Sequence, residues 1–391
     1  MRRNIGARLD AIRKASGAPA TKRPAPQQKP VTAGAGQAPG DDWQRAGAYT
    51  FVRELTFPSP FDGLGFDNPL SYSPLFLRDE EIPGLEELLF FDLETTGLSG
   101  GPGTVVFLAG FGRITGDTLR ITQFFLTDYP GEPEFYSLVS AYLPESPYWI
   151  SYNGKSFDAP MMHTKGAMNG VSFRFDRHGD LLHTSRRLWK RLLPSCSLSS
   201  VESLILGVER SLDIPGALAP EIYFEYLKIG PTPRLAAIGA HHYEDILSLA
   251  KLLAYFCRLG HDPLAEAVPR VDALGLGLLL KSTATGKTVL ERGFEDGDPL
   301  CGKALALLHK SEGNYESALP VWTRLAEEGK DAFAAIELSK YCEHKSGDLE
   351  SALRWANLSQ SLSPENMPLR REETEKRIRR IQRKMERATR E

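Results

Sequence analysis

Cysteine is scarce in this sequence, and long apolar runs are missing. Even the nearest two of the four cysteines, Cys301 and Cys342, are 41 residues apart. This spacing excludes a disulfide-stapled miniprotein and the CxxC pairs of zinc fingers. The longest apolar stretches, such as Leu274–Leu280, are much shorter than the roughly 20 residues that cross a bilayer, and the first residues contain no apolar signal core. We therefore expect a cytoplasmic protein with reduced thiols and no membrane contact.

Charge is distributed unevenly along the 391 residues. The net charge is −3, yet residues 1–40 carry eight Lys and Arg against one acid, and residues 370–391 carry ten against five. The part between these basic tails is therefore acidic. Basic tails can bind a polyanion such as nucleic acid, but the same composition also fits solvated tails.

Sequence patterns divide the chain into an α/β domain and a helical region. Residues 17–40, rich in Pro, Ala, Gly and Gln, predict a disordered linker, so folded structure is expected from about Asp42. Apolar runs bounded by turn residues predict strands that begin at Leu88, Thr104, Leu119 and Tyr148. Helical spacing predicts helices at 132–143, from Phe157 and at 233–259. This order of elements is typical of an α/β sheet domain.

Two segments in the last third of the chain are similar to each other. Lys310–Leu319 (KSEGNYESAL) matches His344–Leu353 (HKSGDLESAL), with Gly313 and Gly347 34 residues apart. This is the tetratricopeptide period, in which paired helices stack to bury their faces. Because such stacks usually need about three units, a degenerate unit within 266–308 or packing on the preceding domain is expected to complete them. Chance similarity between helical hairpins is the alternative.

An acidic pair follows the first predicted strand, FFDLETTGL. Side chains two residues apart on a strand share a face, so Asp92 and Glu94 leave an apolar strand side by side. Their mutual repulsion favours compensation by cations, and oxygen ligands suit Mg²⁺ or Mn²⁺. Alternatively, the strand simply ends here and both acids face water.

Two further polar groups follow along the chain. In SYNGKSFDAP, Asn153 ends a predicted strand and Asp158 begins a predicted helix, where it could also be an ordinary N-cap. In HHYEDILSLAKLL, the histidines His241 and His242 precede Asp245 by four and three residues, so all three share roughly one helix face. A satisfied polar cluster is the alternative for this face.

The ordered set of motifs resembles the DEDD, or DnaQ-like, superfamily of 3′–5′ exonucleases, which has a ribonuclease H-like fold. The matching segments are Asp92–Leu98 (DLETTGL), Asn153–Asp158 (NGKSFD) and His241–Asp245 (HHYED). Together with the repeats, the chain is more specifically similar to the bacterial YprB-type family of predicted exonucleases. The implied organisation is a disordered basic segment (1–41), a ribonuclease H-like mixed sheet flanked by helices (42–260), tetratricopeptide-like repeats (261–368) and a charged C-terminal helix or tail (369–391).

The resemblance implies a role for each motif residue. Two Mg²⁺ or Mn²⁺ ions would be held by Asp92, Glu94, Asp158 and Asp245, for hydrolysis of a terminal phosphodiester. Thr95 and Thr96 would approach the terminal nucleotide, and Asn153 would orient the substrate or its own loop. The third motif departs from the family, which has Tyr four residues or His five residues before the last Asp. Here His241 stands at the first of these positions, so His241, with His242 second, is the candidate general base.

The favoured function is thus a metal-dependent 3′–5′ exonuclease acting on DNA or RNA. One rival is a nuclease-fold scaffold with little or no activity that binds nucleic-acid ends and recruits a protein partner through its repeats. Another is a structure-specific endonuclease.

The GKT at Gly286–Thr288 lacks the Gly required five residues earlier, which excludes a phosphate-binding loop. The cations of a predicted helix either follow a phosphate backbone or form a solvated face: Arg186, Arg187, Lys190 and Arg191.

Overall fold

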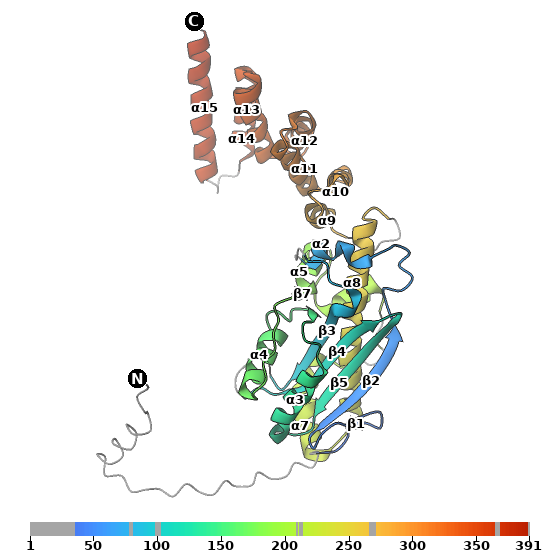
Figure 1. Ribbon diagram of the computed structural model, residues 1–391. Helices are drawn as coiled ribbons and strands as arrows, with labels where there is room; N and C mark the ends of the chain where they lie inside the picture. Colours follow the sequence, from blue (N-terminus) through green and yellow to red (C-terminus); the bar gives the residue numbers. More distant parts are fainter. Residues whose placement is uncertain are drawn as a thin grey trace, which may run out of the picture.

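The computed structural model describes residues 36–77, 81–97, 103–208, 210, 214–265, 271–363 and 368–389 (Figure 1). Most of the segment predicted to be disordered lies outside these residues. Its last part packs on the body, because the Gly36 N–H donates to Thr127 Oγ1 (3.1 Å) and the Tyr226 hydroxyl donates to the Gln37 carbonyl (2.8 Å). Folded structure therefore begins by Gly36, ahead of the predicted start at Asp42.

A seven-stranded mixed sheet forms the centre of the first part, with the strand order β1-β2-β5-β4-β3-β6-β7. Neighbours from β1 to β3 in this order pair antiparallel, whereas β3, β6 and β7 are parallel. The strands are β1 (Gln44–Arg45), β2 (Thr50–Pro58), β3 (Leu88–Thr95), β4 (Val106–Thr115), β5 (Thr118–Leu126), β6 (Tyr148–Ser151) and β7 (His178–Asp180). The predicted α/β class is confirmed, and the four predicted strands are β3 to β6. The sequence patterns missed β2, which alternates between half-buried and exposed residues towards its end, and β7, which has only three residues.

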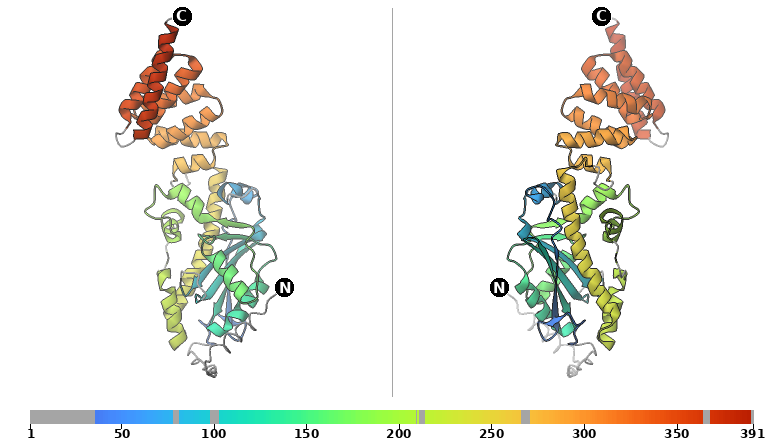
Figure 2. Two further views of the ribbon diagram at one scale, coloured as in Figure 1. Left: turned by 90° about the vertical axis from the view of Figure 1, so that its left-hand side faces the viewer. Right: turned by 90° about the vertical axis from the view of Figure 1, so that its right-hand side faces the viewer.

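Helices cover both faces of this sheet (Figure 2). One face, with Leu89 and Phe91, packs against α3 (Glu132–Tyr142) and α4 (Asp158–Met168). The other face, with Leu88 and Phe90, packs against α8 (Pro233–His261) and its neighbours. Those neighbours are α2 (Ser73–Leu77), α5 (Leu181–Trp189), α6 (Leu198–Val201) and α7 (Ala219–Ile229). Single turns η1 (Pro69–Tyr72), η2 (Leu85–Glu87), η3 (Tyr129–Gly131), η4 (Glu202–Leu206) and η5 (Gly216–Leu218) connect them.

Two glycines of β4 let α8 lie directly on the sheet. A Cβ placed on Gly110 would come within 2.4 Å of His242 Cε1 and of Ile246 Cδ1, and one on Gly112 within 2.8 Å of Ile246 Cγ2. A side chain at either position would therefore push the helix away. Because Gly110 is the cross-strand partner of Asp92, this close approach brings α8 to the end of β3.

The remaining described residues form a helical region. It contains α9 (Ala273–Leu279), α10 (Ala284–Glu295), α11 (Pro299–Ser311), α12 (Tyr315–Glu327), α13 (Ala332–Tyr341), η6 (Cys342–Ser346), α14 (Leu349–Leu362) and α15 (Pro368–Ala388). Gly313 and Gly347, equivalent in the two matched segments, have left-handed φ values of 75° and 74° and each precedes the start of a helix. The matched segments therefore occupy equivalent helix–turn–helix positions. Their assignment to the tetratricopeptide family stays a prediction.

The helical region joins the sheet domain through α5 and α9. The Asp272 N–H donates to the Leu188 carbonyl (2.9 Å), and Arg191 pairs with Asp272 (2.9 Å) and Asp298 (2.8 Å). Arg191 thus pairs with carboxylates at this junction while its side chain remains 42% exposed, and the choice between a phosphate contact and a solvated face stays a prediction. In the described part of the chain, no helix has the length and apolarity that a membrane span requires.

Candidate functional site

The end of β3 presents two carboxylates towards α8. Along this strand Leu89, Phe91 and Leu93 belong to the core under α3 and α4, whereas Leu88 and Phe90 belong to the core under α8. Since side chains alternate along a strand, Asp92 and Glu94 continue the face on which α8 lies. Both side chains are half-buried, and Asp92 is 27% exposed. The predicted common direction of this acidic pair therefore agrees with the fold.

The loop after β6 brings the third carboxylate to the same end of the sheet. Asp180 accepts hydrogen bonds from the backbone N–H groups of Asn153 (2.8 Å) and Lys155 (3.2 Å) and also caps α5. Asn153 has a left-handed φ of 68°, which Asn tolerates better than most residues. The loop is therefore held from a residue that the sequence patterns did not single out. The only sequence feature that marks Asp180 is its position directly before a predicted helix.

Asp158 is not a helix cap. It is the first residue of α4, whose N-cap position is Phe157, and no side chain caps that end of the helix. A Cβ on Gly154 would lie 3.1 Å from Asp158 Oδ2 and 2.4 Å from Ser151 Oγ. The glycine therefore leaves room for the Asp158 carboxylate, and the alternative of an ordinary N-cap is not observed.

His242 is fully buried and uses both ring nitrogens for structure. Gln123 Oε1 accepts from Arg53 Nε (2.6 Å), which orients the amide so that Gln123 Nε2 donates to His242 Nδ1 (2.6 Å). The other nitrogen, Nε2, then donates to the backbone carbonyl of Asp92 (2.9 Å). Burial lowers the pKa of His242 to about 3, so the ring is neutral. It joins α8 to β3 and leaves no nitrogen free to accept a proton from water.

His241 and Asp245 lie next to each other on α8, with His241 Nε2 3.5 Å from Asp245 Oδ2. Arg210 contacts both. Its guanidinium pairs with Glu202 of η4 (2.6 Å), forms a short contact with Asp245, and donates to His241 Nδ1. The Arg210 and Glu202 side chains are 7% and 1% exposed. Sequence reasoning missed both residues, because nothing local distinguishes them.

The four carboxylates affect one another. Burial raises the pKa of Asp92 well above its ordinary value, and charges from three other residues add to this: Asp245, Asp158 and Glu94. Burial, followed by the charges of Asp245 and Asp158, raises the pKa of Glu94 to about 8. Burial raises the pKa of Asp158 to about 7, and the nearby Asp180 adds to this. The residues predicted from three separate motifs thus share one electrostatic environment.

Asp245 is the member of this group with the most compensation. Burial raises its pKa, whereas His241 and Arg210 act in the opposite direction. Within the described ranges, no three His, Cys, Asp or Glu side chains stand close enough together to hold a metal ion as they are placed. The donor chemistry nevertheless fits: four hard oxygen donors in one repulsive group suit Mg²⁺ or Mn²⁺. One cation, Arg210, already lies against one of them.

The two threonines after the acidic pair bind backbone groups. Thr95 Oγ1 donates to the Gly97 carbonyl (2.9 Å), and Thr96 Oγ1 accepts from the Val105 N–H (2.9 Å). A second bond runs from the Thr96 N–H to the Val105 carbonyl (2.9 Å). These contacts hold the end of β3 against the start of β4, so the threonines support the segment that carries Glu94.

Comparison with known proteins agrees with this geometry. Residues 89–257 match the model of the RNase_H superfamily. The uncharacterized protein YprB of Bacillus subtilis (strain 168) is 35% identical over 320 residues, which cover 76% of this chain and 75% of that protein. The matched residues contain all four carboxylates and strands β3 to β7, apart from the first residue of β3. The chain therefore belongs to the family of YprB, and its sheet domain is a member of the RNase H superfamily.

Proposed function

We propose that this protein is a metal-dependent 3′–5′ exonuclease that hydrolyses phosphodiester bonds at the ends of DNA or RNA. The observation that carries the proposal is the common environment of Asp92, Glu94, Asp158 and Asp245. Three separate segments contribute these carboxylates. The charges of Asp245, Asp158 and Glu94 all raise the pKa of the fourth carboxylate, Asp92. Such repulsion is costly to a fold unless cations offset it during function.

The proposed chemistry assigns a task to each residue. Asp92, Glu94, Asp158 and Asp245 would hold two Mg²⁺ or Mn²⁺ ions, which when bound lower the pKa of water and offset charge on the reacting phosphate. His241 is the preferred general base, because both nitrogens of His242 are engaged. The hydrogen bond from Arg210 to His241 Nδ1 must open before that nitrogen can accept a proton. Asn153 and Asp180 keep the Asp158 loop in place.

A digest of end-labelled single-stranded DNA and RNA with Mg²⁺ or Mn²⁺ tests the proposal. We expect shortening from the 3′ end that requires metal. Asp92→Asn should lower the rate at least about 100-fold, because it removes one metal-binding charge. The matched control is Asp117→Asn, an exposed acid on the β4–β5 turn. If wild-type protein shortens neither polymer under these conditions, the exonuclease proposal is wrong.

Substrate ends separate the exonuclease from an endonuclease on the same fold. A linear strand whose 3′ end is blocked and a circular strand should both resist an exonuclease. Cleavage of the circle at a rate comparable to that of the linear strand would replace the proposal with endonucleolytic cutting.

The absence of a ready three-donor group in the described residues, and the contact between Arg210 and Asp245, favour a second candidate. In it, the domain binds nucleic-acid ends without cutting them, and the helical region binds a protein partner. The two candidates differ in their response to Asp92→Asn. An exonuclease loses its turnover in this variant, whereas an end-binding scaffold keeps its affinity for the strand and shows no turnover even in the wild-type protein.

A further inference from the structure

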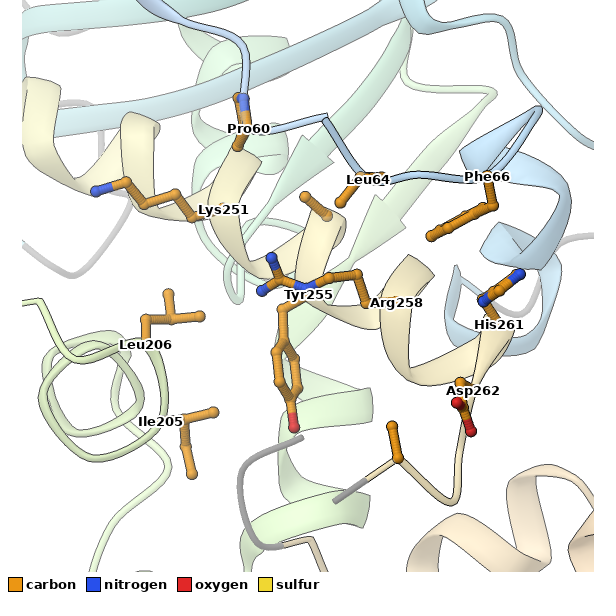
Figure 3. A pocket seen from close by; sticks show the side chains of 12 residues that line it. Pro60, Leu64, Phe66, Ile205, Leu206, Lys251, Tyr255, Arg258, His261 and Asp262 are labelled. Atoms are coloured by element: carbon orange, nitrogen blue, oxygen red, sulfur yellow. The ribbon is translucent and has the colours of Figure 1, made fainter. Parts of the chain in front are cut away.

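A pocket of about 730 Å³ opens beside the second half of α8 (Figure 3). Three segments line it: the loop after β2 with Leu64 and Phe66, the turn η4 with Leu206, and α8 with Lys251 and Arg258. None of the four carboxylates is among its lining residues. The pocket is therefore a feature separate from the proposed metal-binding group.

The walls of the pocket combine flat rings with two cations, Lys251 and Arg258, and one acid, Asp262. The rings of Phe66 and His261 stack with their centroids 4.1 Å apart and their planes 9° from parallel, and His261 is exposed. The guanidinium of Arg258 lies 6.0 Å from the ring of Tyr255. Among the residues that the structure describes, neither Lys251 nor Arg258 forms an ion pair. A planar ring with a nearby anionic group matches such a surface, because the ring can extend the stack while the anion meets the cations.

The pocket and the proposed active site share helix α8, which contributes residues to both. Glu244, Lys251, Tyr255 and Arg258 follow at spacings of seven, four and three residues, so they form one stripe on the helix. Asp245 itself lies about 100° around the helix axis from Glu244, so it is on a different face from this stripe. At about 1.5 Å per helical residue, Lys251 lies about 9 Å and Arg258 about 20 Å along the axis from Asp245.

The turn η4 makes the second connection between the pocket and the carboxylates. Its last residues, Ile205 and Leu206, line the pocket, and its first residue, Glu202, holds the Arg210 guanidinium that contacts Asp245. A chain of nucleotides that leaves the carboxylates past η4 therefore reaches the pocket after a few nucleotides, since one strand of B-form DNA advances about 3.4 Å per nucleotide.

We propose that the pocket binds a nucleotide of the substrate strand a few positions from the bond that is cut. The base of this nucleotide extends the Phe66–His261 stack, and the adjoining phosphates of the strand contact Lys251 and Arg258. The inference rests on the proposed nuclease function and adds to it a subsite that lengthens the preferred substrate. A free nucleotide has the same chemistry, so the experiment must separate the two sources.

Binding is measured in full-length Asp92→Asn protein, which prevents digestion. The pocket variant carries Lys251→Gln and Arg258→Gln, and the control variant carries Lys228→Gln and Lys330→Gln, two exposed lysines away from α8. Three labelled probes are used: an oligonucleotide of about 12 nucleotides, a dinucleotide and a mononucleotide. We expect the pocket variant to bind the long strand about tenfold more weakly and the dinucleotide unchanged. The slope of log K against log salt concentration should become shallower by about 1.4, because two phosphate contacts are lost.

Three outcomes separate a failure of the subsite from a failure of the proposed nuclease function. If the control variant loses as much affinity for the long strand as the pocket variant, the subsite does not exist. If the pocket variant loses equal affinity for the mononucleotide, the pocket is a free-nucleotide site and the strand subsite is wrong. If Asp92→Asn protein binds no probe and wild-type protein digests none, the proposed function fails, and the subsite fails with it.

Discussion

Arg210 decides the charge balance at one corner of the acidic group. Its guanidinium joins Glu202, Asp245 and His241, and its side chain is only 7% exposed. A buried cation in contact with a carboxylate competes with any metal ion for that carboxylate, because both need the same oxygen atoms. Arg210 therefore holds the site in a form that is partly neutralised without metal.

Arg210→Gln should bind Mn²⁺ about tenfold more tightly than the wild-type protein, a gain that corresponds to about 1.4 kcal/mol. The physical reason is the loss of a competing positive charge from Asp245. Titration calorimetry on the purified protein measures this affinity directly, without turnover. Arg234→Gln is the control, since Arg234 pairs with Glu221 and Glu225 on the surface. Equal or weaker Mn²⁺ binding by Arg210→Gln would show that the arginine does not compete with the metal.

At the scale of elements, the contact between β4 and α8 sets the distance between two carboxylate-bearing segments. Gly110 pairs with Asp92 across the sheet and faces His242 and Ile246 of α8. Asp245 lies between these two residues on the helix. The position of Asp245 relative to Asp92 therefore depends on a glycine outside both motifs.

Gly110→Ala should lower the free energy of unfolding by about 1–3 kcal/mol, because its new Cβ overlaps two buried side chains. The displaced helix should also weaken Mn²⁺ binding. Chemical denaturation and calorimetry measure the two effects. Gly103→Ala is the matched control, as a Cβ there meets no atom within 4 Å. Wild-type stability in Gly110→Ala would mean that α8 can shift without cost.

Helix α15 contacts the helical region through the apolar residues Ile378 and Ile381 and through one acid. Glu343 of η6 is fully buried and accepts from Arg377 (2.6 Å), Arg380 (2.6 Å) and Lys384 (2.9 Å) of α15. Burial alone would raise the pKa of Glu343, but hydrogen bonds from Arg380 and Lys384 outweigh it and lower the pKa to about 2. The folded state therefore favours the charged form of Glu343 at this contact.

Glu343→Gln should lower the free energy of unfolding of the helical region by about 1–3 kcal/mol, since three cations lose the negative charge that they share. Hydrogen exchange in residues 368–389 should become faster. Glu372→Gln is the comparison, because its pair with Lys376 is exposed on both sides and such pairs contribute about 0–1 kcal/mol. Unchanged exchange in the Glu343 variant would show that apolar contacts alone hold α15.

At the scale of the whole molecule, the acidic group makes stability depend on pH. Glu94 and Asp158 have folded-state pKa values of about 8 and about 7, against ordinary values of 4.5 and 3.8. Between about pH 4 and pH 8 the folded state therefore keeps protons that the unfolded chain has lost. Because the folded state binds more protons in this range, the free energy of unfolding falls as pH rises.

Without metal, we expect a fall of about 2–4 kcal/mol between pH 5 and pH 8, since both side chains are half-buried and partly screened. Added Mg²⁺ should reduce this slope, because metal binding favours the deprotonated carboxylates. Denaturation at several pH values measures it. The double variant Glu94→Gln/Asp158→Asn should flatten the metal-free slope, and Asp117→Asn should not. A slope that the double variant leaves unchanged would assign the pH dependence to other groups.

Local patterns predicted the parts of the fold that depend on neighbours in sequence. The apolar runs from Leu88 and Thr104 became β3 and β4, and the helical spacing after Pro233 became α8. Period-two and period-3.6 patterns are visible without knowledge of contacts. The three-residue strand β7 has no such pattern, because its pairing with β6 provides most of its order.

The residue types of the acidic motifs were likewise readable from the chain, since a carboxylate at the end of an apolar strand stands out locally. The hydrogen-bond and ion-pair partners of these residues could not be predicted from the sequence. Arg210 lies 35 positions before Asp245, and Gln123 lies 119 positions before His242. No local signal marks such partners, because their position becomes significant only when the chain has folded.

The sequence by itself thus determined the order of strands β3 to β6 and of helices α3, α4 and α8, the four acids and the match between the two helical repeats. Only the tertiary structure decided that His242 is a neutral structural bridge, that Arg210 lies against Asp245, and that a pocket with rings and cations opens beside the second half of α8. The physical reason is that secondary structure follows from the periodicity of neighbouring residues. Charge balance and pocket shape follow from contacts between residues that are distant along the chain.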